Sequence, residues 1–303
     1  MTLYGSVEEL VGETPLVELK HMGFPAGVRV FAKLELSNPA GSVKDRVGRY
    51  MIADAEEKGL LRPGSTIVEA TAGNTGIGIA LAALNKGYRV IFTVPTKFSE
   101  EKQKIMRALG AEIVNTPKEE GMLGAVAEAE RIKETIPGAV SLKQFENMSN
   151  PRSHFETTGP EIYRDLKGHV DYAVMGAGSG GTFSGIVGYL KSQNPAIQGV
   201  LADPVGSIIG GGEKGEYQIE GIGNDFIAKT MDTSLVDRVY KVTDAEAYAM
   251  CRELAKKEGI LAGQSSGAAL AAVRKLADDV GKGNIVTVFP DRGDRYLSKG
   301  LFD

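Results

Sequence analysis

A lysine at the start of a predicted helix is the first candidate for a catalytic group in this chain. Lys44 lies in the run NPAGSVKDR (residues 38–46), an extended loop with a glycine that ends by opening a helix. Ser42 is placed as an N-cap, and Asp45 three residues later completes a capping-box pattern. The positive end of the helix dipole then disfavours the charged form of the Lys44 amine. A Schiff-base lysine requires such an amine, and a solvated lysine at a helix start is the alternative.

A second loop offers hydroxyl and amide groups directly after a predicted strand. The strand TIVEA is followed by TAGNTG (residues 71–76) and then by an apolar helix. The Thr71 and Thr75 hydroxyls, the Asn74 amide and free backbone N–H groups suit a carboxylate, because ligands of open α/β sheets bind beyond the carboxyl ends of strands. The alternative is a βα turn in which Thr and Asn only cap the helix.

Two later loops have the composition of a phosphate site and of a helix cap. The strand YAVM is followed by GAGSGGT (residues 176–182), whose glycines bring backbone N–H groups close to an anion at a helix start. Ser179 and Thr182 add hydroxyl groups to this predicted phosphate cradle. In GQSSG (residues 263–267), Ser265 can hydrogen-bond a ring nitrogen or can serve as a helix N-cap.

The same glycine loop also fits a different class of enzyme. Gly176, Gly178 and Gly181 satisfy the pattern G-x-G-x-x-G, and Asp203 ends the next predicted strand, where a dinucleotide-binding fold places an acidic residue. A nicotinamide-dependent dehydrogenase is therefore a competing hypothesis. Against it, the pattern lies past the middle of the chain, a proline follows Asp203, and Lys44 has no role.

Composition excludes several other classes of function. The chain has 303 residues, with 24% charged and 42% hydrophobic residues and a net charge of −4, which gives no reason to expect nucleic acid as a partner. No apolar stretch reaches membrane-spanning length and no signal peptide is evident, so a cytoplasmic protein is expected. Cys251 is the only cysteine, which rules out an intrachain disulfide. The three histidines lack ligand spacing, so no metal site is expected.

Short apolar runs alternate with helical patterns along most of the chain, which predicts parallel sheets with helices on both faces. The predicted strands are Val30–Leu34, Ile67–Ala70, Arg89–Val94, Glu112–Asn115, Tyr172–Met175, Gly199–Asp203, Val239–Val242 and Ile285–Phe289. The predicted helices are Val43–Lys58, Thr75–Asn85, Ser99–Leu109, Leu123–Glu134, Thr182–Ser192, Asp244–Lys257 and Ser266–Val280. The glycine-rich segment Gly206–Gly223 is irregular, and a loop of that length is more often functional than accidental.

One ligand accounts for the lysine and the three loops, because pyridoxal phosphate (PLP) needs a Schiff-base lysine, a phosphate cradle and partners for its ring nitrogen and ring hydroxyl. Over nearly its whole length the chain resembles the cysteine synthase and cystathionine β-synthase family of fold-type II PLP enzymes. The resembling segments are GETPLVEL, NPAGSVKDR, EATAGNTG, EEKQKIMRALGAEI, QFEN with TTGPEI, GSGGT, EGIG, GQSSGAA and DRYLS.

The resemblance implies a fold and a role for each loop. It implies two doubly wound, mostly parallel α/β domains with PLP in the cleft between them. Residues 40–147 would form a smaller mobile domain, and residues 1–39 and 148–303 a larger one. Lys44 would carry the cofactor, Asn74 would contact its ring hydroxyl and Ser265 its pyridine nitrogen. The remaining implied contacts are Gly178, Ser179, Gly180, Gly181 and Thr182 for the phosphate, and Thr71, Ala72, Thr75, Gln144 and Gly221 for the substrate.

The implied reaction is β-replacement on O-acetyl-L-serine, or on serine or cysteine, through an aminoacrylate intermediate. With sulfide as acceptor the product is L-cysteine, and a homodimer is implied. The segment GSIIGGGEKGEYQIEGIGNDFI is more similar to bacterial O-acetylserine-dependent cystathionine β-synthases, which use homocysteine. Release of H₂S from cysteine is a third possibility. Asp203-Pro204 and Gly210 depart from the usual Glu-Pro and Asn of these relatives, which leaves the acceptor open.

Overall fold

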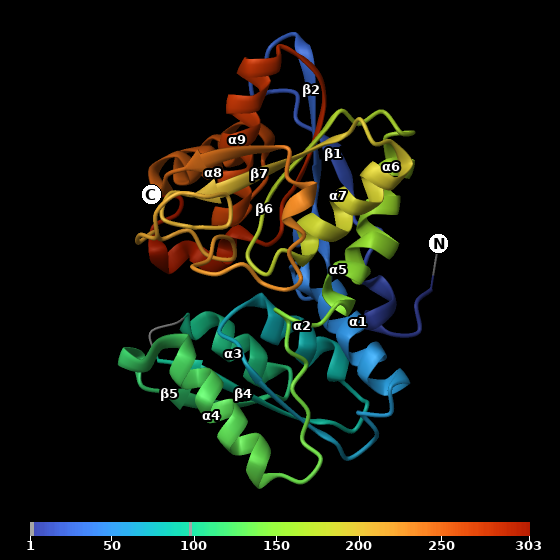
Figure 1. Ribbon diagram of the computed structural model, residues 1–303, viewed down its shortest axis with the longest axis vertical. Coiled ribbons are helices and arrows are strands. Elements are labelled where there is room, and N and C mark those ends of the chain that lie inside the picture. The colour runs from blue at the N-terminus through green and yellow to red at the C-terminus, as the bar shows by residue number, and fades with distance from the viewer. Residues whose placement is uncertain (1–2, 97–98) are drawn as a thin grey trace. The chain divides into compact units, whose positions relative to one another are not determined.

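The computed structural model describes residues 3–96 and 99–303, which form two compact units (Figure 1). One unit comprises Met1–Val11 and Lys44–Ser149, and the other comprises Gly12–Val43 and Asn150–Asp303. The chain therefore changes unit three times, between Val11 and Gly12, between Val43 and Lys44, and between Ser149 and Asn150. Compared with the domains expected from the sequence, residues 3–11 and 148–149 belong to the smaller unit and residues 40–43 to the larger one.

The smaller unit is built on a parallel sheet with the order β3-β4-β5. Val68 of β3 and Ile91 of β4 are buried against Ala129 of α4, as expected for strands that are covered by helices. The elements of this unit are η1 (Val7–Leu10), α1 (Lys44–Glu57), β3 (Thr66–Ala70), α2 (Asn74–Ala83), β4 (Arg89–Pro95), α3 (Glu100–Ala108), β5 (Glu112–Thr116), η3 (Lys118–Glu120) and α4 (Gly121–Thr135).

The larger unit is built on a six-stranded sheet with the order β1-β2-β9-β6-β7-β8. The first pair is antiparallel and all other pairs are parallel. The strands are β1 (Leu16–Glu18), β2 (Gly27–Lys33), β6 (Tyr172–Gly176), β7 (Gln198–Pro204), β8 (Arg238–Val242) and β9 (Lys282–Val288). The helices are η2 (Glu35–Ser37), α5 (Ser149–Ser153), the π-helix η4 (His154–Thr158), α6 (Gly159–Asp165), α7 (Gly181–Gln193), η5 (Thr233–Leu235), α8 (Asp244–Glu258), α9 (Gln264–Val280) and η6 (Gly293–Lys299).

Helices cover both faces of this larger sheet (Figure 1). In β2, Val30 belongs to the core beneath α8 and α9, whereas the next residue, Phe31, belongs to the core beneath α6 and α7. This alternation follows from the two-residue period of a strand. The carboxyl ends of β6 and β7 lead into the glycine loop and the irregular segment that the sequence singled out.

Every strand and helix predicted from the sequence is confirmed, with ends that shift by up to about three residues. The structure adds β1 and the helical segment from α5 through α6, which the sequence analysis did not predict. The segment Gly206–Gly223 is confirmed as irregular. Within the described ranges, no helix is long and apolar enough to cross a membrane.

Candidate active site

Lys44 is the first residue of α1, so the predicted placement of this lysine in the first helical turn is confirmed. Its side chain is half-buried. The predicted cap is shifted, however, because Val43 and not Ser42 directly precedes the helix. Ser42 instead pairs with Asp291 in an isolated antiparallel bridge, and the Val43 N–H donates to the Pro290 carbonyl (2.7 Å). These contacts hold the two residues before Lys44 against the segment of Pro290 and Asp291.

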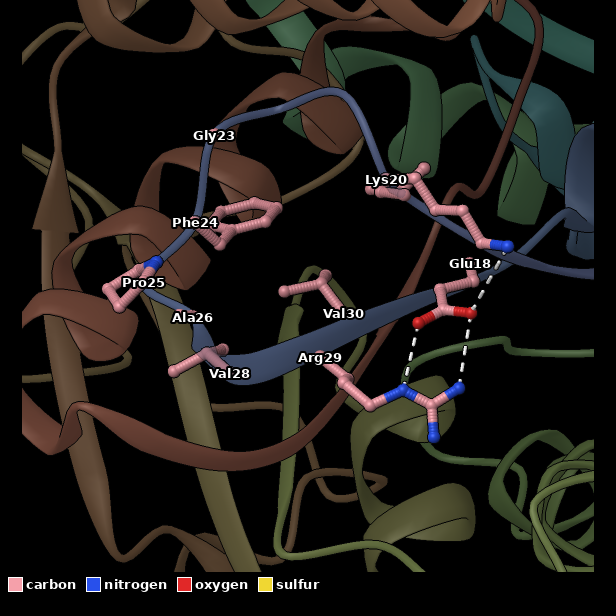
Figure 2. Close-up of a pocket in the computed structure, with 10 residues that line it drawn as sticks. Glu18, Lys20, Gly23, Phe24, Pro25, Ala26, Val28, Arg29 and Val30 are labelled. Atoms are coloured by element: carbon pink, nitrogen blue, oxygen red, sulfur yellow. Dashed lines mark hydrogen bonds and ion pairs between the residues drawn. The ribbon is translucent and has the colours of Figure 1, made fainter.

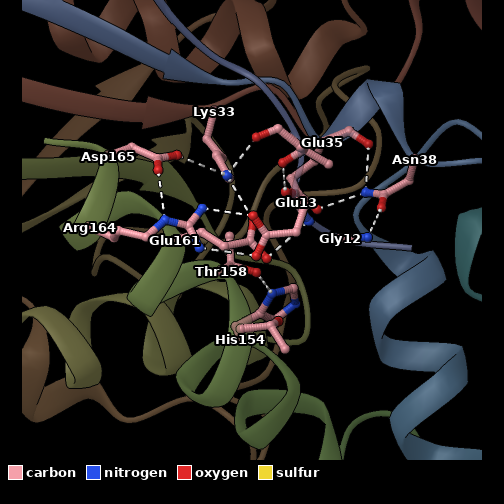
Figure 3. Close-up of polar contacts among 12 residues, drawn as sticks. Gly12, Glu13, Lys33, Glu35, Asn38, His154, Thr158, Glu161, Arg164 and Asp165 are labelled. Carbon is pink, nitrogen blue, oxygen red and sulfur yellow. Dashed lines mark hydrogen bonds and ion pairs between the residues drawn. The ribbon is translucent and has the colours of Figure 1, made fainter. Parts of the chain in front are cut away.

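A buried polar network in the larger unit holds the loop that precedes Lys44 (Figure 3). The Asn38 amide donates to both the backbone carbonyl and the carboxylate of Glu35 (2.9 and 2.8 Å). The Thr14 hydroxyl donates to the second carboxylate oxygen of Glu35 (2.6 Å). The backbone carbonyl of Thr14 accepts from the buried Lys33 ammonium (2.7 Å). Lys33 is paired with Glu161 at 2.7 Å. Thr14, which belongs to the segment GETPLVEL, therefore helps to hold the loop that precedes Lys44. The sequence analysis did not reveal this role.

In the smaller unit the predicted carboxylate loop and Gln144 are brought together. The Thr75 hydroxyl donates to Gln144 Oε1 (2.6 Å), and both side chains are buried. Helix α2 begins at Asn74, with Gly73 as the residue before it, so Asn74 is inside the helix and is not its cap. Thr71 is buried and Ala72 is half-buried at the carboxyl end of β3. The loop therefore presents an amide, hydroxyls and a helix N-terminus in one place, which suits a carboxylate.

Glu69 supports this loop from within the smaller unit and was missed by the sequence analysis. Its Oε2 atom accepts hydrogen bonds from the Ser141 hydroxyl (2.8 Å) and from the backbone N–H groups of Leu142 (2.9 Å) and Lys143 (3.2 Å). Burial raises the pKa of Glu69 above its ordinary value of 4.5. Its contacts fix the segment that ends at Gln144. The only sequence signal was a charged residue inside an otherwise apolar strand.

The predicted phosphate loop of the larger unit has the backbone that such a site needs. Gly180 precedes α7 in a left-handed conformation (φ 80°), which favours glycine. A Cβ atom at Gly178 would lie 2.6 Å from the Gly221 carbonyl oxygen, and one at Gly181 would overlap the Asn150 amide. Asn150 donates to the Ser179 hydroxyl oxygen (2.9 Å), which leaves the Ser179 proton to be donated elsewhere. The glycines therefore let the loop pack closely against Gly221 and Asn150, and the backbone N–H groups of this helix start suit an anion.

Gly221 and Ser265 are brought to the same part of the larger unit. The Gly223 N–H donates to the carbonyl of Ala177, next to the phosphate loop (2.7 Å). The Glu220 N–H donates to the side chain of Gln264, the neighbour of Ser265 (2.9 Å). Ser265 is buried and is the second residue of α9, whose N-cap is Gly263. The alternative that Ser265 is only the cap of this helix is therefore wrong.

Asp203, which the dehydrogenase hypothesis needs, is fully buried. One of its carboxylate oxygens is bonded to the Lys241 ammonium (2.5 Å) and to the Gly210 N–H (2.9 Å). It therefore holds the irregular segment instead of facing a ribose. Lys214 of that segment is paired with Asp225 at 2.6 Å.

A different hollow, of about 340 Å³, lies along the β1–β2 hairpin (Figure 2). Phe24 and Val28 line it, and Arg29 pairs with Glu18 at its edge (2.8 Å). That ion pair holds the pKa of Glu18 below its ordinary value. The hollow contains none of the residues predicted to bind cofactor or substrate. In the described part of the chain, no group of three or more His, Cys, Asp and Glu residues is arranged to hold a metal ion.

Comparison with known proteins gives concordant matches. The model of a family described as pyridoxal-phosphate dependent enzyme matches residues 7–291. The chain is 49% identical to the O-acetylserine dependent cystathionine beta-synthase of Bacillus subtilis over 100% of this chain and 99% of that protein. It is 44% identical to a cysteine synthase of Helicobacter pylori, covering 100% of both chains. A crystal structure of the O-acetylserine dependent cystathionine beta-synthase from Helicobacter pylori matches with TM-score 0.95 and 43% identity, again over 100% of both chains.

Proposed function

This chain belongs to the family of pyridoxal-phosphate dependent enzymes, and we propose that it catalyses β-replacement on O-acetyl-L-serine with a thiol as acceptor. The observation that carries the proposal is the start of α7, where Gly180 has a left-handed backbone and neither Gly180 nor Gly181 has room for a side chain, so backbone N–H groups are what this helix start offers an anion. Family membership removes the nicotinamide-dependent dehydrogenase from consideration.

Several of the predicted residues have the chemistry that the cofactor needs. Backbone N–H groups at the start of α7, with the hydroxyls of Ser179 and Thr182, suit the phosphate without an arginine. Lys44 supplies the amine that links to the aldehyde, and Asn74 suits the ring hydroxyl. Ser265 is uncharged, so it does not hold a facing pyridine nitrogen in the protonated form as a carboxylate would.

Bound PLP supplies an aldehyde that links to amines and a ring that withdraws electrons from the α-carbon of an amino acid. We propose that Lys44 removes the proton from that carbon as a general base, because its amine is half-buried in the first turn of α1, where the helix dipole opposes added positive charge. The loop from Thr71 to Thr75 grips the substrate carboxylate together with Gln144. This grip sets the α-carbon at a fixed place.

The proposed reaction balances without an oxidant or reductant. The Cβ–O bond of O-acetylserine breaks and acetate leaves with the bonding electrons. A Cβ–S bond then forms to the acceptor, and the α-proton is removed and returned. With sulfide the product is cysteine, and with homocysteine it is cystathionine.

The second acceptor is supported by a specific feature of the chain. The segment Gly206–Gly223 contains a run of three glycines (Gly210, Gly211 and Gly212), and the absence of side chains in this run supports room for an acceptor that is larger than sulfide. Relatives with both names are among the matches. We therefore propose sulfide as the first acceptor and homocysteine as the second.

Product analysis separates these possibilities. O-Acetylserine, serine and cysteine are each offered with sulfide and with homocysteine, and the products are identified by mass spectrometry. We expect acetate and cysteine from O-acetylserine with sulfide, and cystathionine with homocysteine. If none of the three amino acids reacts, the proposed function is overturned. If saturating homocysteine gives no product, the function is restricted to cysteine synthesis.

The role of Lys44 has its own test. Borohydride reduction of the purified holoenzyme, followed by peptide mapping, is expected to find the pyridoxyl group on Lys44. Lys44→Ala is expected to lose this label and turnover, whereas Lys58→Ala, just beyond the other end of α1, should keep both. A label on another lysine would overturn the assignment. The homodimer that the resemblance implies and the cytoplasmic location expected from the composition stay predictions.

A further inference from the structure

A buried histidine connects the predicted phosphate loop to the π-helix η4. The Nε2 atom of His154 lies 3.2 Å from the Thr182 hydroxyl oxygen, and its Nδ1 atom lies 2.9 Å from the Thr158 hydroxyl oxygen. Figure 3 shows the contact between His154 and Thr158. Both His154 and Thr158 are fully buried. Nothing in the proposed reaction accounts for this histidine.

The direction of these two hydrogen bonds depends on which ring nitrogen carries the proton. Burial favours the neutral imidazole, which has one N–H donor and one bare acceptor nitrogen. A phosphate oxygen of the cofactor only accepts. If Thr182 is to bind phosphate, as the proposed function requires, its one O–H must be donated to the phosphate, and its oxygen can then only accept from His154.

We propose that His154 is a positioning residue that is held as the Nε2–H tautomer and orients the Thr182 hydroxyl toward the phosphate. The Nδ1 atom is then bare and accepts from the Thr158 hydroxyl. Each group therefore donates a hydrogen bond to the next one: Thr158 donates to His154, His154 donates to Thr182, and Thr182 donates to the phosphate. The other tautomer would turn the Thr182 proton away from the anion.

The packing around His154 supports a fixed ring position. Helix η4 is a π-helix, a form that is frequent at functional sites because it reorients side chains within a helix. Gly185 of α7 lies so close that a Cβ atom there would be 2.6 Å from the His154 Cβ atom. A few residues earlier, Asn150 orients the Ser179 hydroxyl of the same loop. The segment from Asn150 to Thr158 thus orients both hydroxyl groups of the phosphate loop.

The first test reads the tautomer directly in the holoenzyme. The other two histidines, His21 and His169, are exposed, so the variant with His21→Gln and His169→Gln keeps His154 as its only histidine. In this ¹⁵N-histidine-labelled protein, long-range ¹H–¹⁵N spectra are expected to give a pyrrole-type signal for Nε2 and a pyridine-type signal for Nδ1. The reverse assignment, or two pyrrole-type signals from a doubly protonated ring, would overturn the inference.

The second test removes the donor to Nδ1. Thr158→Val is expected to weaken PLP affinity about tenfold, the loss of roughly one hydrogen bond to a charged group, and to shift the ³¹P resonance of bound PLP. Thr158→Ser keeps the hydroxyl and should behave as the unsubstituted protein. Thr157→Val is the matched control, because the Thr157 hydroxyl donates to the Ser153 carbonyl and not to the histidine. Unchanged affinity and ³¹P shift in Thr158→Val would overturn the inference.

The two proposals fail in distinguishable ways. If the unsubstituted protein does not bind PLP, or if Ser179→Ala leaves the ³¹P resonance and the affinity unchanged, the assignment of the phosphate loop fails. If PLP is bound through this loop but His154 carries its proton on Nδ1, only the role of His154 fails.

Discussion

Gly78 of α2 lies so close to Lys44 of α1 that a Cβ atom at residue 78 would overlap the Lys44 carbonyl group. Gly48 faces the same crossing, where a Cβ atom would overlap the backbone of Gly78. Two glycines thus let α1 and α2 approach backbone to backbone within the smaller unit. Because Lys44 starts α1 and Asn74 starts α2, this crossing fixes the distance between the proposed cofactor lysine and the proposed carboxylate loop.

Gly78→Ala is therefore expected to displace the first turn of α1. Overpacking costs about 1–3 kcal/mol in typical cores, and the overlap here is with a backbone that has no rotamer to change. We expect a lower free energy of unfolding in urea and a larger loss of turnover than the stability change alone would give. Gly188→Ala in α7 is the control, because its Cβ atom would have only ordinary contacts from 3.6 Å. Equal activity of the two variants would contradict this role of Gly78.

The sequence predicts the fold well where strands are apolar throughout and are followed by glycine-bearing turns. It did not predict β1, whose three residues are all only half-buried and pair antiparallel at the sheet edge. It also did not predict the helical segment 149–165. That segment begins with Ser149, Asn150 and Pro151, which show no apolar periodicity, and it continues through a π-helix whose period is not that of an α-helix.

The candidate site residues were predicted from the loop motifs in which they stand. The residues that hold these loops in place were not predicted, because no motif marks them. Gly178 to Thr182 stand in a glycine pattern that has a direct physical meaning at a helix start. Glu69, Asn150 and His154 act on these loops from positions that are distant in the sequence, through hydrogen bonds that exist only once the chain is folded. A single sequence carries no record of such pairings. The same limit applies to the cap at Ser42, where a bridge to Asp291 moves the helix start by one residue.

Cys251 is expected to be inert in the native protein. The sequence analysis placed it in a helix, and the structure buries it completely in α8, where its thiol contacts the Gly263 carbonyl oxygen (3.4 Å). Burial raises its pKa to about 12. Since the thiolate is the reactive form, the native thiol should react with a disulfide reagent at pH 8 about a thousandfold more slowly than in urea. Because Cys251 is the only cysteine, the absorbance change of the reagent reports the reaction of this thiol alone. Rapid labelling of the folded protein would contradict the expected inertness.

Glu69 and Glu112 should give pH dependences of opposite sign. Burial raises the folded pKa of Glu69, so the stability it contributes is fully present below 4.5 and is lost as pH rises through the folded value. Hydrogen bonding to Arg89 lowers the folded pKa of the exposed Glu112, so its contribution is present above 4.5 and is lost as pH falls through the folded value.

The measurement is urea unfolding of Glu69→Gln and Glu112→Gln at pH values between 4 and 8. Relative to the unsubstituted protein, Glu69→Gln should gain stability as pH rises above 4.5. Glu112→Gln should lose little, because surface ion pairs contribute about 0–1 kcal/mol. A difference for Glu69→Gln that does not change over this range would show that this carboxyl group does not have a raised pKa.

The irregular segment after β7 is held at one point by Lys241. Its ammonium donates to Asp203 (2.5 Å) and to the carbonyl of Ser207 (2.6 Å), and the Ser207 hydroxyl in turn accepts from the Asn224 N–H (3.1 Å). Both ends of the segment that is proposed to admit the acceptor are therefore joined through these contacts. A similar ion pair, between Lys191 and Asp237 (2.6 Å), lies at the other end of β7 and has no contact with this segment.

Lys241→Met should therefore impair the addition of the acceptor more than the release of acetate. Removing the ammonium leaves the buried Asp203 carboxylate without its cation and releases Ser207, so we expect the KM for sulfide or homocysteine to rise about tenfold. The rate of acetate release from O-acetylserine should change little, because Lys44 and the Thr75–Gln144 pair belong to the smaller unit. Stopped-flow absorbance separates the two steps. Lys191→Met is the matched control, and an equal rise of the acceptor KM in both variants would show that Lys241 acts only through general stability.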